Sequence, residues 1–327
     1  MSAGLKSKFV VLLLCTVAMA GCFEGEPTFQ VRPLIDIPRF QMNFLQANSQ
    51  YIVYETGTTG PLVYVHTLAN NSTVTLSSKP WTVANPILTD YGVVTRQQDS
   101  QTGRASLAIW TAPWAEPRTL HEDGEANLTP LANSGPWLVF GIDRTENRGS
   151  MGIYNLETKA VQLEYPGGYI LEGPTIKMAG ESLFAIAKSG SGRYLLEFNL
   201  ETQEDKLLFK IPDQYNDFLI LEQTVIFQGT SFLRTDFAGK VLTNWTIPGE
   251  SIGRMAIVEK RWIAFDGGVI GGPPELKILD LRTNTIYEMD KNSKYGDRTV
   301  AENRLLVSTE TPTGKSVISE IDFSGLG

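Results

Sequence analysis

The chain has 327 residues, a net charge of −8 and a pI near 5.0. A surplus of acidic side chains disfavours binding to nucleic acid, because such binding needs a basic face that displaces counterions from phosphates. The same surplus disfavours direct binding to an anionic membrane surface. The length is enough for two average domains or for one large all-β domain.

The first 21 residues predict an export signal. Lys6 and Lys8 precede an apolar run at residues 9–17, and small residues follow up to Gly21. The run is shorter than the roughly 20 apolar residues that span a bilayer, which indicates a cleaved signal rather than a membrane helix. The sequence Met19-Ala20-Gly21-Cys22 resembles the lipobox of bacterial lipoproteins. This resemblance implies that the Cys22 thiol carries diacylglycerol and that the new amino terminus is acylated, typically with palmitate.

The alternative is an ordinary secretory signal that ends near Ala20. It leaves Cys22 as a lone thiol, because the other cysteine of the chain, Cys15, lies inside the predicted signal. A lone exposed thiol is a liability in an oxidising compartment, so the cysteine count favours the lipid. By resemblance to lipoproteins of enteric bacteria, Phe23 in place of an Asp favours the outer membrane over the inner one. Residues 22–28 are expected to form a lipidated tether.

The remaining chain contains a repeat. A strand-like run is followed by a polar, Gly-bearing loop and a second strand-like run, and the pair occurs seven times. The first runs begin about 37 to 46 residues apart, at residues 51–54, 91–95, 137–142, 183–187, 225–228, 262–265 and 305–308. The second runs are residues 62–68, 105–112, 151–156, 194–200, 231–237, 275–281 and 316–323. This spacing is typical of propeller blades.

Two further strands complete each repeat. Several second runs end in a tight turn rich in Asn, Asp and Thr, which suits a hairpin, and a third strand follows, as at residues 161–165, 206–210 and 286–289. A fourth segment precedes each first run and is expected to be the innermost strand of the blade. These segments are residues 40–46, 81–88, 126–132, 170–178, 215–221, 252–258 and 295–301.

The ends of the chain predict how the ring closes. The seventh repeat lacks a last strand, whereas the strand-like run 29–35 precedes the first repeat. Pairing this run with residues 316–323 completes the seventh blade. Pro33 suits an outermost strand, which tolerates a missing amide proton. We therefore expect an all-β, seven-bladed β-propeller over residues 29–327, closed by an N-terminal strand.

The repeat of two strands around a Gly-containing loop, often ending in an Asp/Asn-Leu-x-Thr turn, resembles the TolB-like and WD-repeat-like propellers of exported bacterial proteins. The resemblance implies a rigid ring that serves as a docking platform in the cell envelope.

The residues offer little for catalysis. A metal site needs several histidines with carboxylates, and the chain has only His66 and His121. His66 lies in an alternating strand run, which indicates packing, and His121 lies in an acidic loop that is more typical of a solvated turn than of a cation site. The string 189–192, Ser-Gly-Ser-Gly, indicates a hairpin rather than a nucleophile elbow, because no helix follows. We expect no metal, no cofactor and no catalytic residues, although paired carboxylates for sugar chemistry stay open.

Binding is expected on the face where the loops between blades meet the loops between first and second runs. Aromatic and basic side chains predicted to gather there are Trp81, Tyr169, Tyr215, Tyr295, Arg96, Arg144, Arg148 and Arg193, with Trp114 on the opposite rim. The alternative is that the aromatic rings wedge between blades.

Two functions follow as hypotheses. The first is a monomeric, non-catalytic envelope lipoprotein, held at the membrane by its lipid, whose propeller binds another envelope protein. The second is a propeller that binds or cleaves carbohydrate.

Overall fold

The structure is a computed structural model that describes residues 29–37, 42–57, 60–77, 79–124, 126–144, 150–165, 170–247, 252–268, 275–289, 294–310 and 316–323. The predicted signal and tether, residues 1–28, lie outside this part. Within it, no helix is long and apolar enough to cross a membrane. The described residues form strands and turns.

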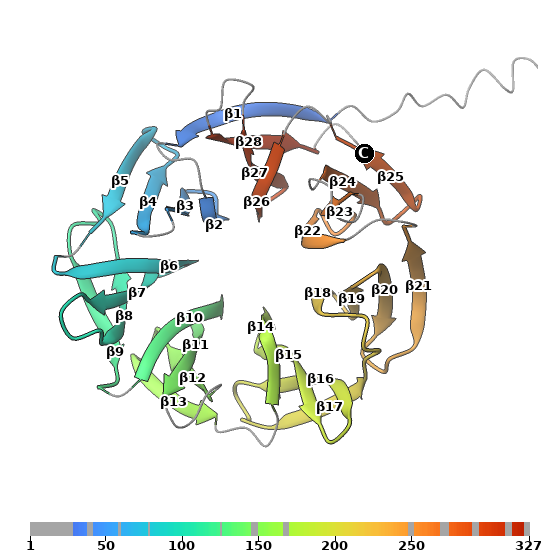
Figure 1. Cartoon of the computed structure of the whole chain (residues 1–327), viewed down its shortest axis with the longest axis horizontal. Helices are drawn as coiled ribbons and strands as arrows, with labels where there is room; N and C mark the ends of the chain where they lie inside the picture. The colour runs from blue at the N-terminus through green and yellow to red at the C-terminus, as the bar shows by residue number, and fades with distance from the viewer. Residues whose placement is uncertain are drawn as a thin grey trace, which may run out of the picture.

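Seven antiparallel sheets of four strands each are arranged in a ring, which confirms the predicted seven-bladed β-propeller (Figure 1). The innermost strands are β2 (Met42–Ala47), β6 (Trp81–Thr89), β10 (Ala126–Ser134), β14 (Ile170–Ala179), β18 (Asp217–Leu221), β22 (Gly253–Val258) and β26 (Lys294–Ala301). The second strands are β3 (Tyr51–Thr56), β7 (Gly92–Asp99), β11 (Trp137–Arg144), β15 (Ser182–Ser189), β19 (Thr224–Gln228), β23 (Trp262–Gly267) and β27 (Arg304–Glu310).

The third strands are β4 (Leu62–Thr67), β8 (Ala105–Trp110), β12 (Ser150–Asn155), β16 (Gly192–Asn199), β20 (Ser231–Asp236), β24 (Glu275–Asp280) and β28 (Ser316–Asp322). The outermost strands are β5 (Ser72–Leu76), β9 (Pro117–Glu122), β13 (Ala160–Tyr165), β17 (Asp205–Lys210), β21 (Val241–Thr246), β25 (Thr285–Glu288) and β1 (Gln30–Ile37). We number the blades from one to seven, beginning with the blade of β2.

The N-terminal strand closes the ring, as predicted. β1 lies outside β28 and pairs with it antiparallel, from Gln30 opposite Asp322 to Ile37 opposite Ser316 (Figure 1). Pro33 is on this outermost strand, where no ladder partner is required on its far side. The seventh blade therefore joins the two ends of the repeat, in the order β1-β28-β27-β26.

Hydrophobic side chains fill the spaces between neighbouring blades. Each of seven buried clusters draws residues from two adjacent blades: Val53 and Val93 meet between blades one and two, and Ile52 and Leu306 lie in the cluster between blades one and seven. The alternation along each second strand explains this, because successive side chains point to opposite faces of a sheet. Every second strand thus contributes to two clusters.

The Asx turns that were expected to link third and outermost strands are present. Asn155 Oδ1 accepts from the amides of Glu157 and Thr158 at 3.0 and 2.9 Å. Asn199 Oδ1 accepts from the amides two and three residues later at 3.0 and 2.8 Å, and Asp280 Oδ1 accepts from the amide of Arg282 at 2.8 Å. These residues form turns rather than a site.

The ring has two faces, which we name by their loops. The connection face holds the links from one blade to the next and the turns between second and third strands. The turn face holds the turns between innermost and second strands and those between third and outermost strands. Each innermost strand therefore begins at the connection face and ends at the turn face.

Candidate functional site

Polar side chains bridge neighbouring blades near the connection face. In four blades, the second strand carries a polar residue two positions after an apolar residue that faces the next blade: Glu55, Arg96, Gln228 and Asp266. Each of them bonds the next blade. Glu55 accepts from the amide of Asn85 at 2.6 Å, Arg96 donates to Asn127 Oδ1 at 3.3 Å, and Gln228 donates to the carbonyl of Ile252 at 2.8 Å. Asp266 accepts from Arg298.

The bridge between blades six and seven is part of a charged cluster. Arg298 is buried, and its Nη2 bonds Asp266, while Arg254 bonds Asp297 and lies 4.0 Å from Asp266. Burial raises the pKa of Asp297, although the neighbouring Arg254 opposes this. Burial also lowers the pKa of the Arg298 guanidinium. Arg254 is the accessible member, since 58% of its side chain is exposed.

Bulges occur in most of the innermost strands of the ring. Six of the seven innermost strands, β2, β6, β10, β14, β22 and β26, change register against their second strands. The shifts in β22 and β26 fall at Arg254 and at Gly296-Asp297. A bulge redirects side chains and is common at barrel rims. The charges between blades six and seven therefore depend on local backbone irregularity.

Two of the aromatic residues predicted on the binding face are buried instead. Tyr215 is 2% exposed, and its hydroxyl lies 3.0 Å from Ser231 Oγ. Tyr295 is 6% exposed in the cluster between blades six and seven. Both rings wedge between blades, as the alternative prediction stated, so neither offers a face for stacking. Trp114 on the turn face is likewise 9% exposed and packs against Tyr51, with ring centroids 5.0 Å apart.

Three predicted residues remain at the connection face with some exposure. Trp81 begins β6 and is half-buried. Arg96 is half-buried on β7, and burial lowers its pKa. Arg193 donates to the carbonyls of Asp213 and Tyr215 at 3.0 and 2.7 Å, which ties β16 to the connection between blades four and five. We call Trp81, Arg96, Arg193 and Arg254 the connection-face rim.

Three other predicted residues are not placed. Tyr169 and Arg148 lie outside the described residues. Arg144 ends β11 opposite Ala126, but its side chain is outside the described part.

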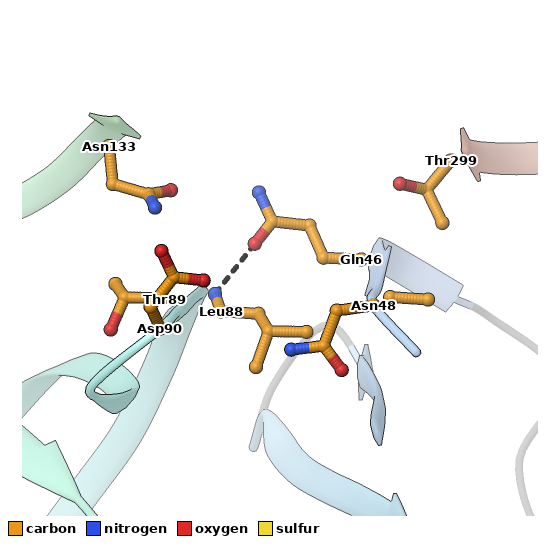
Figure 2. A pocket seen from close by; sticks show the side chains of 8 residues that line it. Gln46, Asn48, Leu88, Thr89, Asp90, Asn133 and Thr299 are labelled. Atoms are coloured by element: carbon orange, nitrogen blue, oxygen red, sulfur yellow. Dashed lines mark hydrogen bonds between the residues drawn. The ribbon is translucent and has the colours of Figure 1, made fainter. Parts of the chain in front are cut away.

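A pocket of about 230 Å³ lies on the opposite face of the ring, the turn face. Its lining comes from four blades: Gln46, Ala47, Asn48, Leu88, Thr89, Asp90, Asn133 and Thr299. Figure 2 shows the amide and hydroxyl groups of this lining around the opening, with Asn133 and Thr299 on opposite sides. Gln46 Oε1 accepts from the amide of Leu88 at 2.7 Å, which fixes its orientation across the boundary between blades one and two.

This pocket suits hydroxyl-rich or amide groups. Its side chains supply both hydrogen-bond donors and acceptors, and Asp90 is the one carboxylate among the lining residues. Four lining residues lie within or at the ends of the predicted innermost strands: Gln46, Thr89, Asn133 and Thr299. Polar residues are common at strand ends, so the sequence alone does not single them out. The signal that identifies them is that they recur at the same end of several repeats.

His66 packs within blade one, whereas His121, on blade two, packs against blade three. His66 is buried, and its Nδ1 lies 2.8 Å from Thr73 Oγ1; burial lowers its pKa. His121 packs against Phe140, with ring centroids 5.5 Å apart. In the described part of the chain, no three His, Cys, Asp or Glu side chains come close enough to hold a metal ion. The string 189–192 forms the turn between β15 and β16, as predicted.

Comparison with known proteins shows the fold. No protein-family model matches the chain, and no curated protein matches it significantly in sequence. Among solved structures, a puromycin-hydrolyzing peptidase of Mycobacterium tuberculosis is similar, with a TM-score of 0.66, 11% identity, and coverage of 91% of this chain and 55% of the peptidase. The chain thus spans about half of that protein.

Two further structures are covered almost completely. The β-propeller domain of the Trilobed protease from Pyrococcus furiosus has a TM-score of 0.63 and 11% identity, with 89% of this chain and 94% of that chain covered. It is described as having an open velcro topology, whereas β1 closes the ring here. The oligogalacturonate lyase of Vibrio parahaemolyticus has a TM-score of 0.62 and 10% identity, with 90% and 97% covered. The fold and these structural similarities identify the chain as a seven-bladed β-propeller.

Proposed function

We propose that this protein is a lipid-anchored, non-catalytic propeller of the cell envelope, more specifically of the outer membrane, that binds another protein through the connection-face rim. The observation that carries the proposal is the rim itself. Three guanidinium groups and an indole lie at the connection face, and hydrogen bonds or ion pairs hold the guanidinium groups of Arg96, Arg193 and Arg254. Trp and Arg dominate binding energy at protein interfaces, and fixed side chains lose less entropy on binding.

The lipid anchor rests on the sequence around Cys22. Replacing Cys22 by Ala is expected to abolish labelling by a fatty-acid precursor and to release the chain from membranes if another peptidase still cleaves the signal. Acyl chains contribute about 0.8 kcal/mol per buried methylene, so their loss removes stable attachment. Radiolabelling and fractionation measure both effects. Unchanged labelling of the variant would contradict the anchor.

The protein partner is tested by purification of the full chain from detergent-solubilised envelopes. We expect a stoichiometric partner whose recovery falls about tenfold for Trp81→Ala or Arg254→Ala, since about 1.4 kcal/mol of binding energy corresponds to a factor of ten. Glu201→Ala on the turn face is the matched control and is expected to retain the partner. Equal loss from rim and control variants would contradict a rim-specific interaction.

The alternative function, carbohydrate binding, is favoured by one observation: the amide and hydroxyl lining of the turn-face pocket (Figure 2). It predicts that the purified chain binds components of a glycan array and that Asn133→Ala reduces this binding, with Trp81→Ala as the control. Glycan binding that depends on Asn133, in the absence of a protein partner, would replace the scaffold proposal.

A further inference from the structure

The described start of the chain emerges from one particular face of the ring. β28 follows the loop between second and third strands, so it begins at the connection face with Ser316 and ends at the turn face with Asp322. β1 runs antiparallel to it, with Gln30 opposite Asp322. The chain therefore enters β1 at the turn face. β1 itself lies on the outer edge of the seventh blade (Figure 1).

An aromatic cluster fixes this entry point. The Phe29 ring lies 5.9 Å from Trp262, 5.8 Å from Tyr287 and 5.4 Å from Phe323, measured between ring centroids. Phe323 and Trp262 are each 1% exposed. Contacts to three aromatic rings from blades six and seven hold the first described residue in place. The position of the point at which the chain enters β1 is thus fixed.

The reach of the preceding segment is short. Residues 22–28 extend at most about 25 Å, because an extended chain advances about 3.3–3.6 Å per residue. Crossing the ring from the turn face to the connection face takes about 20–26 Å, since the strands have six to eight residues that each rise about 3.3 Å. If residues 22–28 ran along the outside of the ring from the turn face to the connection face, their whole length would be used. They could not then also reach a bilayer beyond the connection face.

The turn face carries a surplus of negative charge, which an anionic membrane repels. The described turns of this face carry nine carboxylates and five cationic groups. The acidic residues are Asp90, Glu116, Glu157, Glu181, Glu201, Glu204, Glu222, Glu259 and Glu302, and the basic residues are Lys159, Lys240, Lys260, Arg261 and Arg282. An anionic bilayer repels this surplus, but salt screens the repulsion over about 8 Å. A reach of about 25 Å accommodates that distance, so repulsion does not reverse the orientation.

From these observations we infer that the turn face, with its polar pocket, looks toward the membrane, while the connection-face rim points away from it into the aqueous space. The inference rests on the lipid anchor of the proposed function. It assigns the partner to the side that is remote from the lipid, where a soluble protein or domain has free access. A ligand of the turn-face pocket must instead enter the narrow space between ring and bilayer.

The orientation is measured by energy transfer on vesicles that carry the full lipidated chain. Single cysteines at opposite ends of one strand accept a donor fluorophore: Ser191→Cys at the connection face and Thr202→Cys at the turn face, on either side of β16. Both sites are exposed turn residues. Thr230→Cys and Ala238→Cys, also at exposed positions, form a second matched pair around β20. The acceptor is a rhodamine-labelled headgroup lipid in phosphatidylcholine vesicles that contain phosphatidylglycerol.

We expect more energy transfer from Thr202→Cys and Ala238→Cys than from the connection-face member of each pair. Equal or stronger transfer from Ser191→Cys and Thr230→Cys would overturn the inference. Flotation of the same samples separates the two levels of the argument. A chain that floats with the vesicles but shows no difference between faces refutes the orientation alone, whereas a chain that does not float refutes the anchor and the orientation with it.

Discussion

Removal of β1 is the most direct test of how this ring is held together. A shortened chain that begins at Arg39 lacks the strand, and a chain that begins at Phe23 retains it. The strand pairs at seven positions with β28 and buries Ile35 and Ile37, each 8% exposed, against the cluster between blades one and seven. Phe29 adds its aromatic contacts. At about 1.5–3 kcal/mol for each buried apolar side chain, the loss is about 5 kcal/mol or more.

Such a loss is measurable by thermal unfolding. With an unfolding entropy of about 2.1 cal/mol/K per residue, roughly 300 residues give about 0.6 kcal/mol/K, so the melting temperature is expected to fall by about 8 °C. The exposed edge of β28 also favours association, which light scattering detects. Within the full-length chain, Ile35→Ala is expected to cost about 2–5 kcal/mol, and Val31→Ala, on the same strand but 42% exposed, much less. Equal melting temperatures and monomeric behaviour of the two chains would refute closure by β1.

Two further predictions concern the interior of the blades and one ion pair. A Cβ on Gly152 meets the Phe140 ring at 2.0 Å, so Gly152→Ala is expected to destabilise the chain by about 1–3 kcal/mol in urea unfolding, whereas Gly124→Ala, with open space around it, is expected to have little effect. Burial opposes ionisation of Asp280, but its hydrogen bonds from Arg261 and a backbone amide outweigh burial and lower its pKa. The stability it contributes is therefore present above a pH of about 4 and is lost as the pH falls through the lowered pKa. Asp280→Asn is expected to lower the free energy of unfolding at neutral pH, and the gap between the variant and the original chain is expected to narrow in acid. A gap that stays constant from neutral pH down to about pH 2 would contradict this.

The propeller was predictable because its signals are local. The Asx turns at Asn155, Asn199 and Asp280 mark the ends of third strands, and short apolar runs mark the second strands, so the spacing of these runs orders the blades. The closing strand followed from counting strands, since a seventh blade with three strands leaves an open edge. Neither step needed knowledge of contacts between blades.

The site was less predictable because it depends on which way a side chain turns at a bulge or a blade boundary. A large aromatic residue near the start of an innermost strand has the same pattern whether it wedges between blades, as Tyr215 does, or remains half-exposed, as Trp81 does. The pairing of Arg254 with Asp297 joins two blades and is invisible to periodicity. Register shifts in the innermost strands place these charges, and the repeat pattern does not show where such shifts occur.

The pairing of β1 with β28 also governs the order in which the protein can fold. Arg32 and its ion-pair partner Glu320 are separated by 288 residues, whereas blades one to six each close through hairpins between consecutive strands. During synthesis from the N-terminus, β1 emerges first and its partner last. Six blades can assemble as the chain arrives, while β1 waits without a partner and the apolar residues Ile35 and Ile37 stay exposed. The last step of folding is therefore long-range and slow compared with hairpin formation, and it is the step at which a passing chaperone or a second copy competes most effectively for the unpaired strand.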